Sequence, residues 1–236
     1  KGSIMTHEDP SIQLPRLLSE GGVRTVHLIS LHGLASKLGV GVGFDEEIRT
    51  RSDYGRAEDL MDRALARLER HDDSPLFMYL HFVDSHAPYT RGGKRGAPYE
   101  RYLRELALVD RELGRLRALL AERKLDDRTI LVVSADHGEA FGEHGMKYHA
   151  VSLYEELLRV PLFVKVPGLA RRVVDEPVTL VDLGPTILDA YGLPTPAAFL
   201  GQSLVPLMRG DDKPLSRPIA AEAARRIEAL YFRDGR

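Results

Sequence analysis

Short apolar runs alternate with amphipathic patterns along this chain, and this alternation limits the fold more than any other feature. The strand-like runs are Thr25–Ser30, Leu76–Val83, Ile130–Ser134 and Leu162–Val166. The helical patterns are Pro10–Glu20, Asp53–Arg70, Tyr99–Lys124 and Val181–Tyr191. Strands that alternate with helices predict an α/β fold with a mostly parallel central sheet flanked by helices. The last three runs are continuously apolar, which predicts buried strands, and Ile130–Val133 suits a central parallel strand covered on both faces.

The two long helical patterns each carry an apolar stripe. In the earlier one the stripe is Leu60, Ala64, Leu65 and Leu68. In the later one it is Tyr102, Leu106, Val109, Leu113, Leu116 and Leu120. Steps of three to four residues place such positions on one side of a helix. Each pattern therefore predicts an amphipathic helix with one apolar face.

Length and composition narrow the class of protein. The chain has 236 residues, 43% of them hydrophobic, which suits one large domain spanning residues 1–236 with a sizeable core. The formal net charge of −2 favours neither nucleic acid nor an anionic membrane as a partner. No apolar run approaches the roughly 20 residues that span a bilayer. The chain has no cysteine, which excludes disulfides and thiolate metal sites but leaves the compartment open.

Ionisable side chains are concentrated directly after the run Ile130–Val133. Asp136 and His137 come first, and Lys147 and His149 follow in the same loop. Ligand sites of open α/β sheets gather beyond the carboxyl ends of the strands, which is where this loop begins. A carboxylate beside an imidazole suits Mn²⁺ or Zn²⁺, and Ca²⁺ also accepts the carboxylate. The alternative interpretation is a solvated polar loop.

A second strand end carries the same residue types. In the stretch LHFVDSHAPY, Asp84 and His86 follow the run Leu76–Val83. Taken alone, His86 is more simply explained as a turn residue. Two strand ends that each deliver an aspartate and a histidine favour a shared site, so we predict that His86 converges with Asp136, His137 and His149 on one cleft. The other histidines, His27 among them, lack such context and are interpreted as structural or exposed.

Several ordered motifs of the chain resemble the sulfatase family of the alkaline phosphatase superfamily. VDSHAPY resembles that family's Asp-x-His-x-Pro-Tyr turn, and VVSADHGEAFGEHG resembles its metal-binding loop. SLYEELLRVPLFVKVPG resembles the segment after that loop, and VTLVDLGPTILDAYGLP resembles the later helix that precedes Gly-Leu-Pro. GVRTVHLIS with GVGFDEE resembles the family's early strand and turn. The similarity runs in order from about Ile12 to Glu222 and implies an alkaline-phosphatase-like fold.

The resemblance also implies chemistry. Family members hydrolyse sulfate esters with one divalent cation, for which Ca²⁺ is the first expectation and Mn²⁺ or Zn²⁺ are alternatives. Asp136 and His137 match two metal ligands, although members often carry Asn at the second position. His86 and His149 match residues beside the transferred group and leaving oxygen, with Lys147 as a rival for the second role. The implied substrate class is a small-molecule or carbohydrate sulfate ester, and the resemblance leaves the compartment open between periplasmic, secreted and cytoplasmic.

The family's nucleophile motif, Cys/Ser-x-Pro-Ser-Arg, is not found in the chain. Without cysteine, no formylglycine derived from cysteine can form within these residues. We expect the nucleophile and two further acidic ligands upstream of residue 1, and we expect this chain by itself to be inactive. A phosphoryl or phosphonate hydrolase, a phosphotransferase with a threonine nucleophile, and a non-catalytic homologue remain alternatives. Identity of the nucleophile would decide between them.

Overall fold

The computed structural model of the chain describes residues 13–34, 39–149, 152–211, 219–223 and 227–231. The chain divides into two compact units, Lys1–Lys124 and Leu125–Arg236. Each unit is described by itself, and the single domain expected over residues 1–236 stays a prediction. The first three residues of the predicted helix Pro10–Glu20 lie outside the described part.

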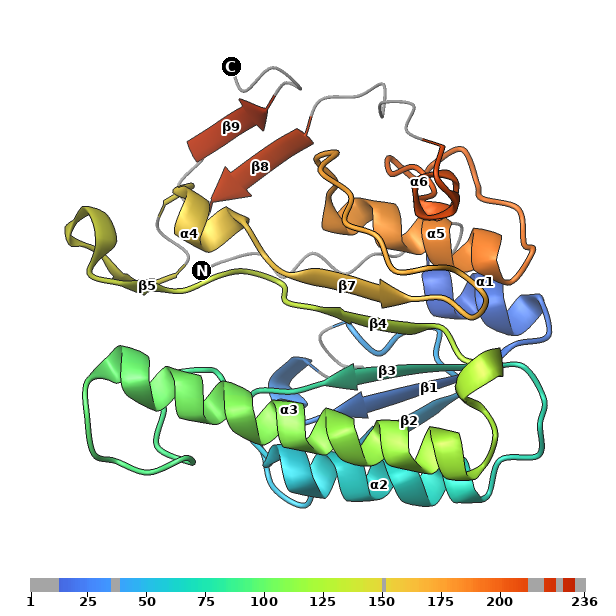
Figure 1. Cartoon of the computed structure of the whole chain (residues 1–236), viewed down its shortest axis with the longest axis horizontal. Coiled ribbons are helices and arrows are strands. Elements are labelled where there is room, and N and C mark those ends of the chain that lie inside the picture. The colour runs from blue at the N-terminus through green and yellow to red at the C-terminus, as the bar shows by residue number, and fades with distance from the viewer. Residues whose placement is uncertain (1–12, 35–38, 150–151, 212–218, 224–226, 232–236) are drawn as a thin grey trace. The chain divides into compact units, whose positions relative to one another are not determined.

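The first unit is built on a three-stranded parallel sheet in the order β2-β1-β3 (Figure 1). These strands are β1 (Arg24–Ile29), β2 (Glu46–Arg49) and β3 (Leu76–His81). β1 pairs on both sides, and all its residues after Arg24 are buried. β3 pairs only with β1 among the described residues, and all six of its residues retain some exposure. In this sheet the strand that pairs on both sides is therefore more deeply buried than its neighbour β3.

The helices of this unit are α1 (Leu14–Glu20), the short 3₁₀ turn η2 (His32–Leu34), α2 (Ala57–Glu69) and α3 (Pro98–Glu122). α2 and α3 lie side by side (Figure 1). The predicted stripe of α2 is confirmed at Leu60, Ala64 and Leu68, which are buried, although the helix begins at Ala57 rather than Asp53. The polar residues before Ala57 form a turn instead.

The predicted buried face of α3 is only half right. Leu116 and Leu120 are buried as expected, but Leu106 is 39% exposed and two glutamates, Glu105 and Glu112, take buried positions. Buried carboxylates require partners, because an isolated charge is costly to remove from water. Arg111 and Arg115 supply them to Glu112, and the same arginines reach Glu58 and Asp62 of α2. The buried face of α3 therefore includes paired glutamates and differs from the face that hydrophobicity alone predicts.

The second unit contains short antiparallel pairs. Its strands are β4 (Leu131–Ser134), β5 (Ala140–Phe141), β6 (Lys147–Tyr148), β7 (Leu162–Lys165), β8 (Ile219–Ala223) and β9 (Ile227–Tyr231). They pair as β4-β7, β5-β6 and β8-β9. The helices and 3₁₀ turns are η4 (Asp126–Arg128), η5 (Glu143–Gly145), α4 (Glu155–Leu158), η6 (Leu180–Asp182), α5 (Leu183–Ala190) and α6 (Val205–Arg209).

The strands predicted at Leu76–Val83, Ile130–Ser134 and Leu162–Val166 are confirmed, each one or two residues shorter. Their predicted burial is wrong for β3, β4 and β7, because no residue within these strands is fully buried and Phe163 is 68% exposed; Val83, two residues after β3, is buried. The parallel pairing expected for Ile130–Val133 is wrong as well, since β4 pairs antiparallel with β7 in the described part of the chain. Each of β3, β4 and β7 has one paired edge there, which leaves apolar side chains partly uncovered.

The α/β class expected from the sequence is confirmed. The helix predicted at Val181–Tyr191 is also confirmed, as η6 followed by α5. Asp182 is buried at their junction and accepts hydrogen bonds from the backbone N–H groups of Thr179 and Gln202. Within the described residues, no helix combines the length and the apolar character that a bilayer crossing demands.

Candidate functional site

The turn after β3 buries one of its two predicted polar side chains and exposes the other. The carboxylate of Asp84 is 1% exposed, and its Oδ1 lies 2.9 Å from the guanidinium of Arg91. The same oxygen accepts a hydrogen bond of 3.1 Å from the backbone N–H of Ala57, the first residue of α2. Asp84 therefore joins β3, α2 and the turn. This carboxylate is used inside the first unit, and the predicted convergence of His86 with Asp136, His137 and His149 does not depend on it.

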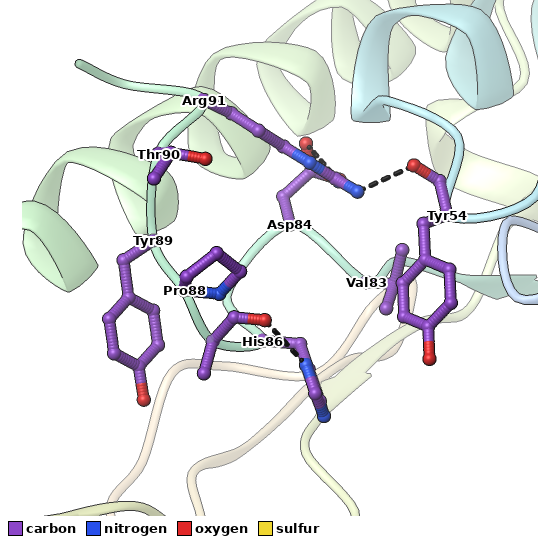
Figure 2. Close-up of a pocket in the computed structure, with 9 residues that line it drawn as sticks. Tyr54, Val83, Asp84, His86, Pro88, Tyr89, Thr90 and Arg91 are labelled. Atoms are coloured by element: carbon purple, nitrogen blue, oxygen red, sulfur yellow. Dashed lines mark hydrogen bonds and ion pairs between the residues drawn. The ribbon is translucent and has the colours of Figure 1, made fainter. Parts of the chain in front are cut away.

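His86 stands on the exposed side of that turn. Its Nδ1 lies 2.9 Å from the carbonyl oxygen of Ala87, so Nδ1 carries the proton and donates it. In a neutral ring this leaves Nε2 as an acceptor. The ring lines a cavity of about 400 Å³, shared with Tyr54, Pro88 and Arg91 (Figure 2). His86 is thus the polar, accessible group of a pocket formed within one unit.

The loop after β4 begins with the two predicted metal ligands. The side chain of Asp136 is 81% exposed and that of His137 is 42% exposed. Asp136 Oδ1 accepts a hydrogen bond of 3.1 Å from the backbone N–H of His137, while the imidazole Nδ1 lies 2.8 Å from the carbonyl oxygen of Gly138. Both side chains are therefore accessible, and each is oriented by one local hydrogen bond.

Gly138 lets this loop lie directly against α4. Its N–H donates a 2.8 Å hydrogen bond to the carbonyl oxygen of Leu157, and a Cβ atom at this position would come within 2.0 Å of the carbonyl oxygen of Glu156. Only glycine fits so close an approach of two backbones. The sequence Asp136-His137-Gly138 is in this way placed by packing as well as by its strand.

A two-stranded hairpin then brings the chain back beside His137. β5 and β6 pair Ala140 with Tyr148 and Phe141 with Lys147. His149 follows β6, and its ring centroid lies 4.1 Å from that of His137, with 30° between the ring planes. Three predicted residues, Asp136, His137 and His149, are thereby close together. Lys147 lies on β6 with its side chain exposed.

Two carboxylates near the hairpin were missed by sequence reasoning. Glu139 is 8% exposed and its Oε1 lies 3.1 Å from Nδ1 of His149. Glu156 lies 3.8 Å from Nε2 of His144, whose ring stacks on Tyr154 at a centroid separation of 3.8 Å. The first pair orients a predicted site residue, and the second fastens the hairpin to the α4 segment. The sequence signal for the first pair is weak, because ten positions separate Glu139 from His149.

The turn after β3 also holds residues that the sequence did not single out. Glu105 of α3 is fully buried, and its Oε1 accepts hydrogen bonds of 2.6 and 3.0 Å from the backbone N–H groups of Arg91 and Gly92. Arg91 in turn holds Asp84 and the backbone at Tyr54. These contacts span 7 to 37 positions in the sequence, and those of Glu105 and Tyr54 lie too far apart for a local motif to have revealed them.

The donor chemistry of Asp136 and His137 fits part of a divalent cation site. Carboxylate oxygen and imidazole nitrogen are both common ligands, and both side chains are accessible. The described residues contain no group of three or more histidine or acidic side chains arranged around one ion. His86 belongs to the other unit, so its predicted convergence with Asp136, His137 and His149 stays a prediction.

Comparison with known proteins shows which family has this pattern of strands, turn and loop. A family model described as Sulfatase matches residues 13–193. The chain belongs to the sulfatase family. Arylsulfatase K of Canis lupus familiaris is 36% identical to this chain over 138 residues, which cover 54% of the chain and 25% of that protein. The sulfatase-family chain therefore spans about a quarter of the length of the curated relatives it matches.

Solved structures agree with the fold. The structure of BT4656 in complex with its substrate D-glucosamine-2-N,6-O-disulfate has a TM-score of 0.71 at 19% identity, over 88% of this chain and 66% of that one. Ps i-CgsB in complex with k-i-k-neocarrahexaose has a TM-score of 0.74 at 18% identity, over 95% of this chain and 63% of that one. At such identities the likeness establishes the fold of the sulfatase-family chain.

Proposed function

We propose that the protein is a metal-dependent sulfuric ester hydrolase and that this chain carries part of its active site. The observation that carries the proposal is the loop after β4, where His149 stacks on His137 beside Asp136 in a chain of the sulfatase family. An exposed carboxylate and two adjacent imidazoles offer ligands and proton donors in one place. The identity of 36% to an arylsulfatase over 138 residues supports the same chemistry.

Asp136 and His137 would hold the divalent cation. Ca²⁺ is the ion we expect first, and Mn²⁺ and Zn²⁺ are alternatives. When bound, such an ion neutralises negative charge on the sulfuryl group and its nucleophile. The exposure of both side chains supports this role, because neither carboxylate nor imidazole is occupied in a buried ion pair. A cysteine-derived formylglycine cannot come from this chain, which has no cysteine.

The remaining predicted residues act on the transferred group. His149 would donate a proton to the leaving oxygen, with Glu139 holding its Nδ1 so that Nε2 is the reactive nitrogen. Lys147, exposed on β6, is the rival for that role. His86 would contribute through Nε2, because its Nδ1 is committed to the carbonyl of Ala87. Cationic partners of this kind stabilise charge that develops on sulfuryl oxygens.

The substrate class we propose is a sulfate ester of a carbohydrate or another small molecule. Its support is that the structural neighbour BT4656 binds D-glucosamine-2-N,6-O-disulfate as its substrate. The cavity beside His86, about 400 Å³, falls in the size range of roughly 300–1,000 Å³ typical of small-molecule sites.

Activity of the protein expressed from its complete gene tests the proposal. We expect hydrolysis of aryl and sugar sulfates, loss of activity on chelation, and recovery on adding back Ca²⁺, Mn²⁺ or Zn²⁺. The variant Asp136→Asn should abolish metal-dependent turnover, whereas Asp175→Asn, which changes an exposed aspartate elsewhere in the same unit, should retain it. Faster hydrolysis of phosphate or phosphonate esters than of sulfate esters would overturn the assignment.

A further inference from the structure

We propose that Tyr54 is a specificity-determining residue, whose ring forms a stacking platform for the organic part of the substrate. The group it would accept is a six-membered ring with an apolar face, which either a pyranose or an aryl group can present. The inference rests on the proposed sulfatase function, and it concerns only residues of the first unit.

The backbone at Tyr54 is held in a conformation that side-chain-bearing residues rarely adopt. Its φ angle is +53°, in the left-handed region where a bulky residue is unusual. Such conformations persist only where surrounding contacts over-determine them, and they cluster at ligand-binding sites. The position of Tyr54 is therefore a feature that the rest of the turn maintains.

Two groups maintain it. The guanidinium of Arg91 donates hydrogen bonds of 2.6 Å to the carbonyl of Tyr54 and 3.1 Å to that of Gly55. Oδ1 of Asp53 accepts a bond of 3.0 Å from the N–H of Tyr54 and another of 2.7 Å from the N–H of His32. Tyr54 is thus fixed through both its backbone N–H and its backbone carbonyl.

Gly55 ties the same turn to the sheet. Its N–H donates to the carbonyl of Ser30, directly after β1, and a Cβ atom here would lie 2.2 Å from Oγ1 of Thr50. The turn can reach this depth only with glycine at position 55. Tyr54 therefore projects from a rigid base at the carboxyl end of the sheet, where α/β folds place their ligands.

The ring itself contributes little to the core. Tyr54 is 49% exposed, and its centroid lies 6.2 Å from that of His86, with 59° between the planes. Figure 2 shows the rings of Tyr54, His86 and Tyr89 directed to the same side of the pocket, while Arg91 extends on the opposite side to the backbone of Tyr54. A half-exposed ring fixed next to a histidine that acts on the ester is suited to bind the adjoining part of the substrate.

The surroundings decide what kind of group fits. Arg91 is engaged by Asp84 and by two backbone carbonyls, so its guanidinium serves as a support. The pocket wall beside His86 is otherwise formed by the ring of Tyr54, by the apolar side chains of Val83, Ala87 and Pro88, and by Tyr89 and Thr90. Such a surface favours flat or apolar ring faces through stacking and dispersion. A substrate without a ring gains little from it.

Kinetics of the protein from its complete gene test the inference with three substrates: 4-nitrophenyl sulfate, methyl glucopyranoside 6-sulfate and propyl sulfate. The variant Tyr54→Ala should lower kcat/KM for the ring-bearing ester that the site accepts by about three- to tenfold. Tyr54→Phe should stay within about twofold of wild type, since it keeps the ring. Propyl sulfate should be unaffected, and Tyr99→Ala, which removes a tyrosine that is 52% exposed on α3, should change nothing.

Ligand-observed NMR supplies a readout that needs no turnover. Irradiating the protein's upfield methyl protons, where neither ligand has a signal, should transfer saturation to the ring protons of phenyl sulfate or of methyl glucopyranoside 6-sulfate, and Tyr54→Leu should strongly weaken the transfer. The larger loss identifies an aryl or a pyranose ring as the natural group. Equal losses of kcat/KM for propyl sulfate and for both ring esters would overturn the inference while leaving the sulfatase function intact. If wild type hydrolyses no sulfate ester but the Tyr54-dependent transfer persists, the proposed function fails and the ring site stands.

Discussion

The turn after β3 and the loop after β4 present the same two residue types directly after a strand, yet they use the aspartate in opposite ways. The side chain of Asp84 is 1% exposed, and that of Asp136 is 81% exposed. Asp84 is held by Arg91 and the N–H of Ala57, whereas Asp136 contacts mainly its own neighbour His137. One carboxylate holds the fold together and the other is available to a ligand.

The difference teaches that partners, not position after a strand, decide the role of an ionisable residue. A buried carboxylate is tolerated only where a cation and hydrogen-bond donors meet it, because burial of an unpaired charge is expensive. Arg91 and the start of α2 provide that environment for Asp84. An exposed carboxylate keeps its lone pairs free for an ion, as metal binding requires.

The largest effect we expect is on stability at Asp84. Asp84→Ala should lower the free energy of unfolding by about 3 kcal/mol, because it leaves Arg91 largely buried without its counter-charge and the N–H of Ala57 without its acceptor. Urea unfolding followed by circular dichroism measures the change. Asp136→Ala is the matched control and should stay within about 0.5 kcal/mol. Similar losses in the two variants would erase the distinction between the two strand ends.

The reverse contrast should appear in activity. In the protein from its complete gene, Asp136→Asn should lower kcat/KM about a hundredfold or more, since removal of one group that stabilises developing charge costs roughly 10²–10³ in rate. Its midpoint of thermal unfolding should match that of wild type. Steady-state hydrolysis of 4-nitrophenyl sulfate provides the measurement. A variant that retains a tenth or more of wild-type kcat/KM would remove Asp136 from the metal site.

Sequence patterns predicted elements better than environments. The strands β1, β3, β4 and β7 and the helices α2, α3 and α5 were found because hydrophobic periodicity acts over a few residues. The buried face of α3 was not, because Glu105 is buried against backbone N–H groups of Arg91 and Gly92 and Glu112 is buried in ion pairs with Arg111 and Arg115. A pattern of hydrophobic residues does not reveal where a carboxylate finds such partners.

The candidate site shows the same limit. Asp136, His137 and His149 were predicted together, and the hairpin β5-β6 brings His149 onto His137. Glu139 and Tyr54 were missed, since their roles depend on hydrogen bonds and backbone geometry that composition does not encode. The antiparallel pairing of β4 was also missed, because the apolar pattern of a strand is the same in either direction.

Gly138 tests whether the loop after β4 needs its own packing support. Gly138→Ala should lower stability by about 1–3 kcal/mol, because the added methyl group would overlap the carbonyl of Glu156, which belongs to the backbone and cannot move aside easily. Gly114→Ala is the matched control: it lies within α3 with open space around it and should stabilise by about 0.5–1 kcal/mol. Thermal unfolding of both variants gives the comparison. A neutral Gly138→Ala would show that the loop does not depend on α4.

The smallest effect we expect concerns a third environment, that of the core histidine His27. It tests the stability of the sheet independently of the two strand ends. His27 is fully buried in β1, with its ring 5.0 Å from Phe44 and 5.6 Å from Tyr79. Burial lowers the pKa of His27, and the carboxylate of Glu47, 3.6 Å away, opposes that shift only in part. Because the pKa is lower in the folded chain than in the unfolded one, the unfolded chain takes up the proton first as the pH falls. His27 therefore contributes stability that is fully present above the unfolded value of about 6.5 and is lost as the pH falls below it toward the folded pKa.

The variant His27→Phe removes this titration while keeping an aromatic ring against Phe44, so between pH 7.5 and 5.5 its free energy of unfolding should fall less than that of wild type. Urea unfolding at several pH values measures the two slopes, with His71→Gln, a histidine outside β1, expected to follow wild type. Equal slopes for wild type and His27→Phe would show that the core histidine is not what couples the stability of the sheet to pH.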